Sequence, residues 1–185
     1  MKIPPKKAFA VSQVRRFLEP GPVVLVSSAY KGETNIMTLG WHMVMETAPS
    51  LIGCYIWDQN HSRELIERSK ECVINVPTFD MAKTVVRIGN TSGREIDKFE
   101  KFRLTAADAR KVGAPLVAEC HAHFECRLAD ARMSRKYNFF VFEVVAAQAA
   151  IAPKNPRTIH YRGDGIFMVS GRNVSFRRMF RPEML

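Results

Sequence analysis

The sequence predicts a mainly β protein, a β-barrel or β-sandwich that carries only a few short helices. Two observations support this fold class. Short runs of β-branched and aromatic residues recur along the whole chain and are separated by residues typical of turns. Segments with helical spacing are few and short, so strands do not alternate with helices as they do in parallel α/β folds.

Length and composition predict one domain, residues 1–185, with 46% hydrophobic and 25% charged residues. The net charge of +10 is compatible with an anionic partner. However, the basic residues are spread along the chain without the aromatic pattern of an RNA-binding sheet, so we do not expect nucleic-acid binding. Residues 1–7 have no apolar run after their charges, and no segment is long and apolar enough to span a membrane. We therefore expect a cytoplasmic protein without a membrane partner.

The first third of the chain reads as a helix followed by a hairpin. Apolar residues at three-and-four spacing predict an amphipathic helix over residues 8–18, which the prolines of residues 20–22 end. A β-branched run at 23–28 predicts a strand. A turn at 30–33 then returns the chain as a second strand from residue 34.

The next segments place a polar loop between a strand and a helix. Residues 51–56 form an apolar run, residues 58–62 are polar, and residues 63–70 have short-helix spacing with Ser62 as the expected cap. The start of a helix offers free backbone N–H groups and the positive end of its dipole, which suits a phosphate. An ordinary capped helix remains the alternative.

Residues 72–77 predict a buried strand, and residues 81–88 predict a helix with Met81, Val85 and Ile88 facing inward. The glycine-bearing stretch 89–99 predicts a loop where backbone can approach a ligand. It has neither a P-loop nor a dinucleotide-binding glycine pattern.

Alternation dominates residues 116–128 and predicts one strand. Cys120 and Cys126 would lie on one face, with His121, His123 and Glu125 on the other, so a four-ligand zinc site would need a break in the strand. We expect no metal and interpret the histidines as a polar strand face. The four cysteines have no CxxC spacing and lie in apolar segments, which predicts buried thiols.

The remaining segments are predicted strands at 139–146, 158–161 and 166–169. Residues 170–185 form a basic arm. It contains the densest cluster of arginines, namely Arg172, Arg177, Arg178 and Arg181. We interpret this segment as an exposed tail or as an arm that packs on a partner subunit.

Residues 34–43 mix hydrogen-bonding side chains, a glycine and a tryptophan between two apolar runs. Buried polar groups need partners, so this mixture favours a flat polar ligand with apolar faces. An irregular loop hydrated by water is the alternative.

Four motifs in order carry a family resemblance: Asn35-Ile36-Met37-Thr38 with Trp41, Asn60-His61-Ser62, Ser92-Gly93 and Asp97-Lys98-Phe99. With them the chain resembles the flavin reductase-like family, and within it the flavoredoxin and ferric reductase branch, from about residue 20 to residue 169. The resemblance implies an FMN-binding split β-barrel with a few short peripheral helices, usually a homodimer with the flavin near the subunit interface. It also implies a set of cofactor-binding residues: Asn35, Met37, Thr38, Leu39, Trp41, Asn60, His61, Ser62, Ser92, Lys98, Tyr137 and Phe167.

In this resemblance Asn35 and Trp41 surround the flavin, and the backbone of residues 37–39 runs along its ring. Residues 60–62 meet the ribityl phosphate, while Lys98 supplies charge to the polar end of the flavin or to the phosphate. Tyr137 and Phe167 lie where side chains near the ring are expected. FMN itself carries the redox chemistry, so we assign no catalytic acid, base or metal.

The implied activity is hydride transfer from NADH or NADPH to FMN, followed by electron transfer to free flavin, a ferric chelate or a protein. Three alternatives stay open. They are a flavoredoxin-type electron carrier, a non-enzymatic basic binding module, and a haem protein that uses His42, His61 or His160 as axial ligand.

Overall fold

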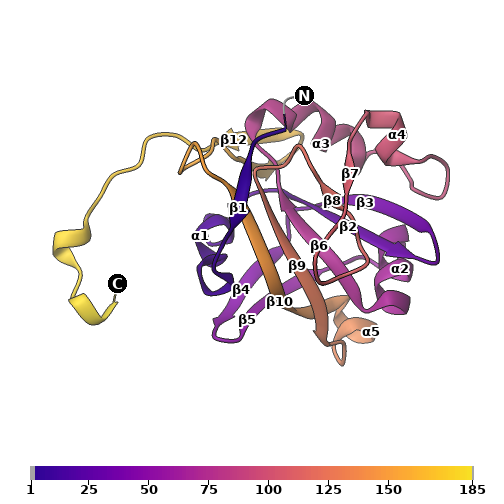
Figure 1. Ribbon diagram of the computed structural model, residues 1–185, viewed down its shortest axis with the longest axis horizontal. Coiled ribbons are helices and arrows are strands. Elements are labelled where there is room, and N and C mark those ends of the chain that lie inside the picture. Colours follow the sequence, from indigo (N-terminus) through magenta and orange to yellow (C-terminus); the bar gives the residue numbers. More distant parts are fainter. Residues whose placement is uncertain (1–2, 185) are drawn as a thin grey trace.

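The structure is a computed structural model that describes residues 3–184 and shows an antiparallel β-barrel that is open along one side (Figure 1). Its 8-stranded sheet has the order β3-β2-β6-β9-β10-β5-β4, with β1 paired to β10. The strands of this sheet are β1 Lys6–Ala8, β2 Val24–Tyr30, β3 Glu33–Leu39, β4 His42–Thr47, β5 Ser50–Tyr55, β6 Glu71–Val76, β9 Ala122–Asp130 and β10 Phe139–Ala150. The mainly β fold class predicted from the sequence is confirmed.

Two small strand pairs and several short helices surround the barrel. The pairs are β7 Ala106–Ala107 with β8 Leu116–Val117, and β11 Ile159–Gly163 with β12 Ile166–Val169. The helices are η1 Val11–Gln13, α1 Arg15–Leu18, α2 His61–Ser69, η2 Phe79–Met81, α3 Ala82–Gly89, α4 Lys98–Phe102, α5 Ser134–Tyr137, η3 Arg177–Met179 and η4 Pro182–Met184.

Strand β10 holds the two halves of the barrel together. Residues 139–143 pair with β5 and residues 148–150 pair with β1, while the other edge follows β9. The register against β9 shifts after Val141 and after Val144. Such irregularities bend a strand and increase its twist, so one long strand can serve both halves.

Strands β3 and β4 are the two ends of the sheet. Helices α2, α3 and α4 all contact β3, whereas α1 contacts β4 (Figure 1). An end strand presents backbone groups that no neighbouring strand satisfies. The surroundings of β3 therefore decide what its free edge can bind.

Both faces of β2 are buried. Val24 and Val26 face the interior of the barrel, while Val23 and Leu25, just before and within the strand, face a second cluster beneath α3 and α4. A strand covered on both sides needs no polar alternation. This explains the continuous apolar run at residues 23–26.

The predicted helix at 8–18 is wrong in its extent. The structure has the end of β1, then η1 and the four-residue helix α1. The apolar residues that suggested one helix do face inward, since Val14 and Leu18 are fully buried. Lys6 to Ala8 instead pair with β10, because an exposed strand edge was available there.

The prediction of one strand over 116–128 is also wrong, because β8 and β9 are separate. The histidines of this segment do not form a solvated face either, since His121, His123 and Glu125 are all buried. Residues 103–117 cover this side of the sheet, and the carboxylate of Glu125 accepts hydrogen bonds from two backbone N–H groups of that segment, at 2.6 and 3.0 Å.

Asn75 of β6 links this covering segment to the barrel. Its amide nitrogen donates to the hydroxyl of Ser27 at 3.0 Å and to the carbonyl of Leu25 at 3.2 Å. Its carbonyl oxygen accepts from the N–H of Val117 at 2.9 Å and contacts Nδ1 of His123 at 2.9 Å. Burial lowers the pKa of His123 to about 3, so this imidazole is neutral near pH 7.

The four cysteines are buried free thiols, as predicted. Residues 170–184 extend away from the barrel as an arm, with residues 171–184 exposed (Figure 1). Leu185, the last residue of the predicted arm, lies outside the described residues. Within residues 3–184, the helices are too short or too polar to cross a bilayer.

We predict that Asn75→Leu destabilises the fold by roughly 3 kcal/mol or more. The substitution keeps the volume but leaves at least two buried groups without partners, at about 1–3 kcal/mol each. Urea unfolding measures the effect. Asn173→Leu is the matched control, at an exposed position whose side chain has no hydrogen bond to residues 3–184. It should change the free energy of unfolding by less than about 0.5 kcal/mol. Equal midpoints for the two variants would contradict the role of Asn75.

Candidate functional site

Three neighbouring cavities follow β3 and its outer end, and Thr38 lines all of them. We name each by one of its residues. The Asn35 cavity, of about 360 Å³, lies between β3, the start of α2 and the loop after α3. The Trp57 cavity, of about 230 Å³, lies over Leu39 and Tyr55. The Tyr161 cavity, of about 490 Å³, lies between α3 and the β11–β12 hairpin.

Most of the residues predicted to bind the cofactor are brought together here. The Asn35 cavity is lined by Asn35, Met37, Thr38, Asn60, His61, Ser92 and Lys98. Leu39 and Trp41 join the Trp57 cavity, and Phe167 lines the Tyr161 cavity together with Trp41. The four sequence motifs thus meet along one strand edge, although up to 63 residues separate them.

The edge of β3 offers backbone groups to these cavities. The carbonyl of Ile36 points away from β2, since it accepts a hydrogen bond from Lys98. Backbone groups alternate in direction along a strand, so the N–H and C=O of Thr38 point to the same edge. The Thr38 hydroxyl donates to the carbonyl of Val85 at 2.7 Å, which fixes α3 against the strand.

Lys98 places a cation at this edge. Its side chain is 5% exposed, and its ammonium donates to the carbonyls of Ile36 at 2.8 Å and Ile88 at 3.1 Å. Burial lowers the pKa of Lys98 to about 8. In most molecules Lys98 is therefore still protonated at pH 7, and its positive charge favours an anionic ligand.

Asn35 has an unused acceptor. Its amide nitrogen donates to the Ser62 hydroxyl at 2.9 Å, while its Oδ1 is buried and has no partner among the described residues. A Cβ at Gly93 would lie 2.2 Å from that oxygen, so only glycine lets the loop approach here. An unpaired buried acceptor costs about 1–3 kcal/mol, and a ligand that donates to it would remove that cost.

The start of α2 also faces the Asn35 cavity. Asn60, not Ser62, caps the helix, because its Oδ1 accepts from the Ser62 N–H at 3.1 Å. The prediction that Ser62 is the cap is therefore wrong by two positions. Asn60 and His61 line the cavity, so the positive end of the helix dipole lies beside it. His61 Nε2 contacts Glu33 at 2.7 Å.

Two predicted residues do not reach the cavities. Ser62 is fully buried and is not part of the cavity wall, so its hydroxyl positions Asn35 from behind. Tyr137 lies on α5, is 56% exposed and lines none of the three cavities. Within one chain, neither of these side chains lines the three cavities, and their contact with a ligand stays a prediction.

Other lining residues were missed from the sequence. Trp57 and Gln59 lie three residues and one residue before Asn60, and Asn90 and Thr91 directly precede Ser92. Their closeness in the sequence to the family motifs is the signal that could have identified them as lining residues. Trp57 is 59% exposed and Trp41 is 69% exposed, so two indoles border the Trp57 cavity in the monomer.

Arg94 ties the loop over the Asn35 cavity to α2. Its guanidinium donates to the carbonyl of Gln59 at 3.1 Å and to the carboxylate of Glu64 at 2.7 Å. The hydrogen bond from Arg94 holds the pKa of Glu64 below its usual value. The contact is exposed, so it positions the loop without contributing much stability.

The fold and this site define a class of protein: an open barrel with a preformed, polar, cation-bearing cleft at one strand edge. The chain belongs to the family described as flavin reductase like domain, whose model matches residues 14–165. Its fold is the split barrel of flavin reductase-like proteins.

Comparisons with individual proteins agree with this membership. An FMN-binding domain of a flavin reductases-like enzyme from Shewanella baltica OS155 superposes with a TM-score of 0.87 at 26% identity, covering 95% of this chain and 99% of that one. The uncharacterized protein YddH of Escherichia coli (strain K12) is 31% identical over 174 residues, covering 86% of this chain and 92% of its own length. A flavoredoxin of Desulfovibrio vulgaris (Miyazaki F) shares the fold, with a TM-score of 0.77 at 18% identity, over 85% of this chain and 90% of that one.

The lowered pKa of Lys98 predicts how stability depends on pH. Above about pH 8 the folded chain loses the Lys98 proton, whereas an unfolded lysine keeps it up to the ordinary pKa of 10.5. The unfolded state then binds more protons, so this residue makes stability rise with pH between these values.

We expect the free energy of unfolding of the wild type, relative to that of Lys98→Met, to increase from pH 8 to pH 10. Urea unfolding at several pH values measures the difference. Lys101→Met, on the exposed side of the same helix, is the control and should follow the wild type at every pH. A constant difference between the wild type and Lys98→Met would refute the lowered pKa.

Proposed function

We propose that the protein binds FMN in the clefts along β3 and is an oxidoreductase. It takes a hydride from NADH or NADPH and passes electrons to a second acceptor such as free flavin, a ferric chelate or a protein. The observation that carries the proposal is the buried Oδ1 of Asn35, which has no partner among the described residues and belongs to the same cavity as Lys98. All four family motifs contribute residues to this cavity. Bound FMN would supply a two-electron redox centre.

The residues present suit the chemical groups of FMN. The N-terminal turn of α2, with Asn60 and His61, and the loop at Ser92 and Gly93 offer backbone N–H groups and a positive dipole to a phosphate. Asn35 Oδ1 is free to accept a hydrogen bond from a hydroxyl or N–H of the ligand. The free edge of β3 matches a heterocycle that has donors and acceptors along its rim.

The side chains of the site would hold and orient the bound FMN, and none needs to exchange a proton with a substrate. Lys98 offsets negative charge that develops on a bound ring or that belongs to its phosphate. Trp41, which packs on Tyr55 with ring centroids 5.1 Å apart, provides an aromatic wall. The Tyr161 cavity shares Thr38 with both other clefts and Trp41 with the Trp57 cavity, and it leaves room for a second molecule.

A flavoredoxin-type electron carrier is the second candidate within this fold. It would hold FMN as tightly but would react slowly with pyridine nucleotides. The shared fold with the Desulfovibrio vulgaris protein supports it, at an identity too low to carry the activity across. A basic binding module without flavin is the third candidate, and it predicts a colourless protein whose affinity for nucleic acid falls steeply with salt.

The visible spectrum of the purified protein separates these candidates. With FMN added back under anaerobic conditions, we expect flavin absorbance that NADH or NADPH bleaches within seconds. The faster nucleotide identifies the donor. Flavin that binds but stays oxidised, although dithionite reduces it, would favour the carrier. Failure to bind FMN would refute both.

Two variants test the site in the same assay. Asn35→Leu and Lys98→Met should each weaken FMN binding by about tenfold or more, since each removes a buried polar contact worth about 1.5–3 kcal/mol. Lys101→Met is the matched control and should bind FMN as the wild type does. Equal affinities for all four proteins would remove the Asn35 cavity from the proposal.

We also propose that the protein works as a homodimer, with the flavin near the subunit interface. Two uncovered apolar surfaces support this. Strand β4 exposes Met43 and Met45 next to Trp41, and the arm at 171–184 exposes Phe176 and Phe180. Exposed apolar groups at this density mark contact surfaces. Figure 1 shows the arm leaving the barrel on the side of α1, β4 and β5.

An arm that embraces a second copy predicts a clear change in oligomeric state. Phe176→Asp with Phe180→Asp should shift a dimer towards monomer in sedimentation velocity at micromolar concentration, because burying two carboxylates without partners is unfavourable. Arg177→Gln with Arg178→Gln is the control within the same arm and should perturb the dimer less. A wild type that is monomeric at every concentration would refute the proposal.

A further inference from the structure

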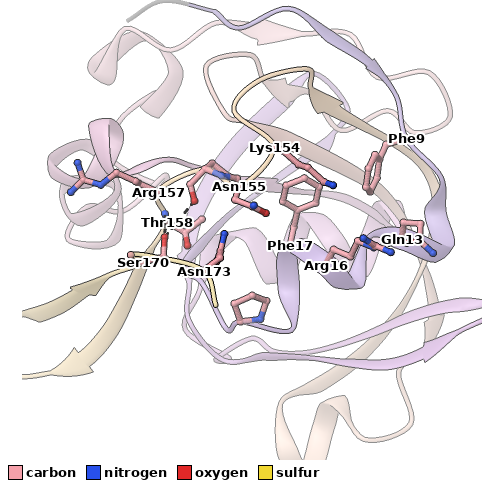
Figure 2. A pocket seen from close by; sticks show the side chains of 13 residues that line it. Phe9, Gln13, Arg16, Phe17, Lys154, Asn155, Arg157, Thr158, Ser170 and Asn173 are labelled. Carbon is pink, nitrogen blue, oxygen red and sulfur yellow. Dashed lines mark hydrogen bonds between the residues drawn. The ribbon is translucent and has the colours of Figure 1, made fainter. Parts of the chain in front are cut away.

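A fourth cavity lies away from the flavin clefts and shares no residue with them. It has a volume of about 380 Å³, within the range of small-molecule sites. One wall is formed by Phe9 and by residues of η1 and α1, and the other by the loop at 154–158 and the first residues of the arm (Figure 2). We call it the Phe17 cavity.

The floor of this cavity is aromatic and fixed. The rings of Phe9 and Phe17 meet edge to face with centroids 5.4 Å apart. Phe17 also packs against Phe124 at 6.1 Å and His121 at 5.7 Å, and both of these belong to the buried interior. Because the floor is anchored on the core, a flat apolar group can stack or lie against it without ordering new side chains.

The opposite wall is also held in place. The N–H of Thr158 donates to the Ser170 hydroxyl at 2.8 Å, and the N–H of Ser170 donates to the carbonyl of Thr158 at 2.9 Å. The N–H of Phe79 donates to the carbonyl of Arg157 at 2.7 Å. Because these residues are already ordered, the protein loses less conformational entropy on binding than it would with a flexible wall.

All the charged residues of the lining are cationic: Arg16, Lys154 and Arg157. Figure 2 shows the Arg157 side chain directed away from the cavity, in line with its stacking over Phe79 at 4.7 Å. Arg16 and Lys154 remain beside the aromatic floor. Within residues 3–184 neither of them forms an ion pair, and Arg16 uses only its Nε, to Gln13 at 2.5 Å.

We propose that the Phe17 cavity binds a planar aromatic anion. Its ring would lie against Phe17, and its carboxylate or phosphate would meet the guanidinium of Arg16 and the ammonium of Lys154. The carboxamide of Asn155, which has no hydrogen-bond partner in the described chain, faces the same space and can donate to the anion (Figure 2). This site lies outside the flavin clefts, so its ligand need not be the redox substrate.

Two kinds of molecule have this chemistry: free aromatic acids and adenine nucleotides. Isothermal titration calorimetry of the full-length protein, with and without FMN, compares 2-naphthoate with its neutral analogue 2-naphthamide, and adenosine 5′-monophosphate with adenosine. We expect each anion to bind at least about fivefold more tightly than its neutral analogue. Added salt should weaken the binding of the anions and leave the binding of the neutral analogues unchanged. The tighter of the two anions identifies the source.

Charge-neutral variants test the residues. Arg16→Met and Lys154→Met should each weaken binding of the anion at least about fivefold and leave binding of the neutral analogues unchanged. Both side chains are exposed, so neither change should disturb folding, which the melting temperature checks. Lys136→Met, on α5, is the control. Equal binding of anion and neutral analogue, no binding of either anion, or anion binding that survives both substitutions would overturn the proposal.

Discussion

The buried ammonium of Lys98 is the contact on which the flavin clefts depend. It joins three elements, since it lies at the start of α4 and donates to a carbonyl of β3 and to the last turn of α3. A cation removed from water must be solvated by protein dipoles, and here two backbone carbonyls do so. The same contact that holds the helices against the strand therefore also brings positive charge to its edge.

The opening of the barrel explains why the clefts lie where they do. A closed barrel would pair β3 with β4 and leave no free backbone. In this chain the sheet ends at both strands, and each edge is treated differently. Strand β3 is enclosed by α2, α3 and α4, which creates a narrow polar cleft, whereas β4 carries exposed methionines and is suited to contact another protein surface.

The basic charge of the chain is divided among distinct tasks. Arg63 is buried and donates to the carbonyls of Ile56 and Ser134, so it fixes α5 to the barrel. Lys98 serves the clefts, and Arg16 with Lys154 gives the Phe17 cavity its positive field. These cations lie on different elements, so the net charge of +10 is spread over several parts of the chain.

Local patterns in the sequence determined the fold class and the motifs of the site. Apolar runs and turn residues specify strands through local sterics and burial, and the order of four short motifs identified the family. Most of the residues in those motifs do line one connected set of cavities. Only the tertiary structure decided that Ser62 lies behind Asn35, that the glycine at 93 makes room for the Asn35 oxygen, and that His121 and His123 are buried. These features depend on contacts between residues distant in the sequence, and periodicity along one segment carries no information about what covers it.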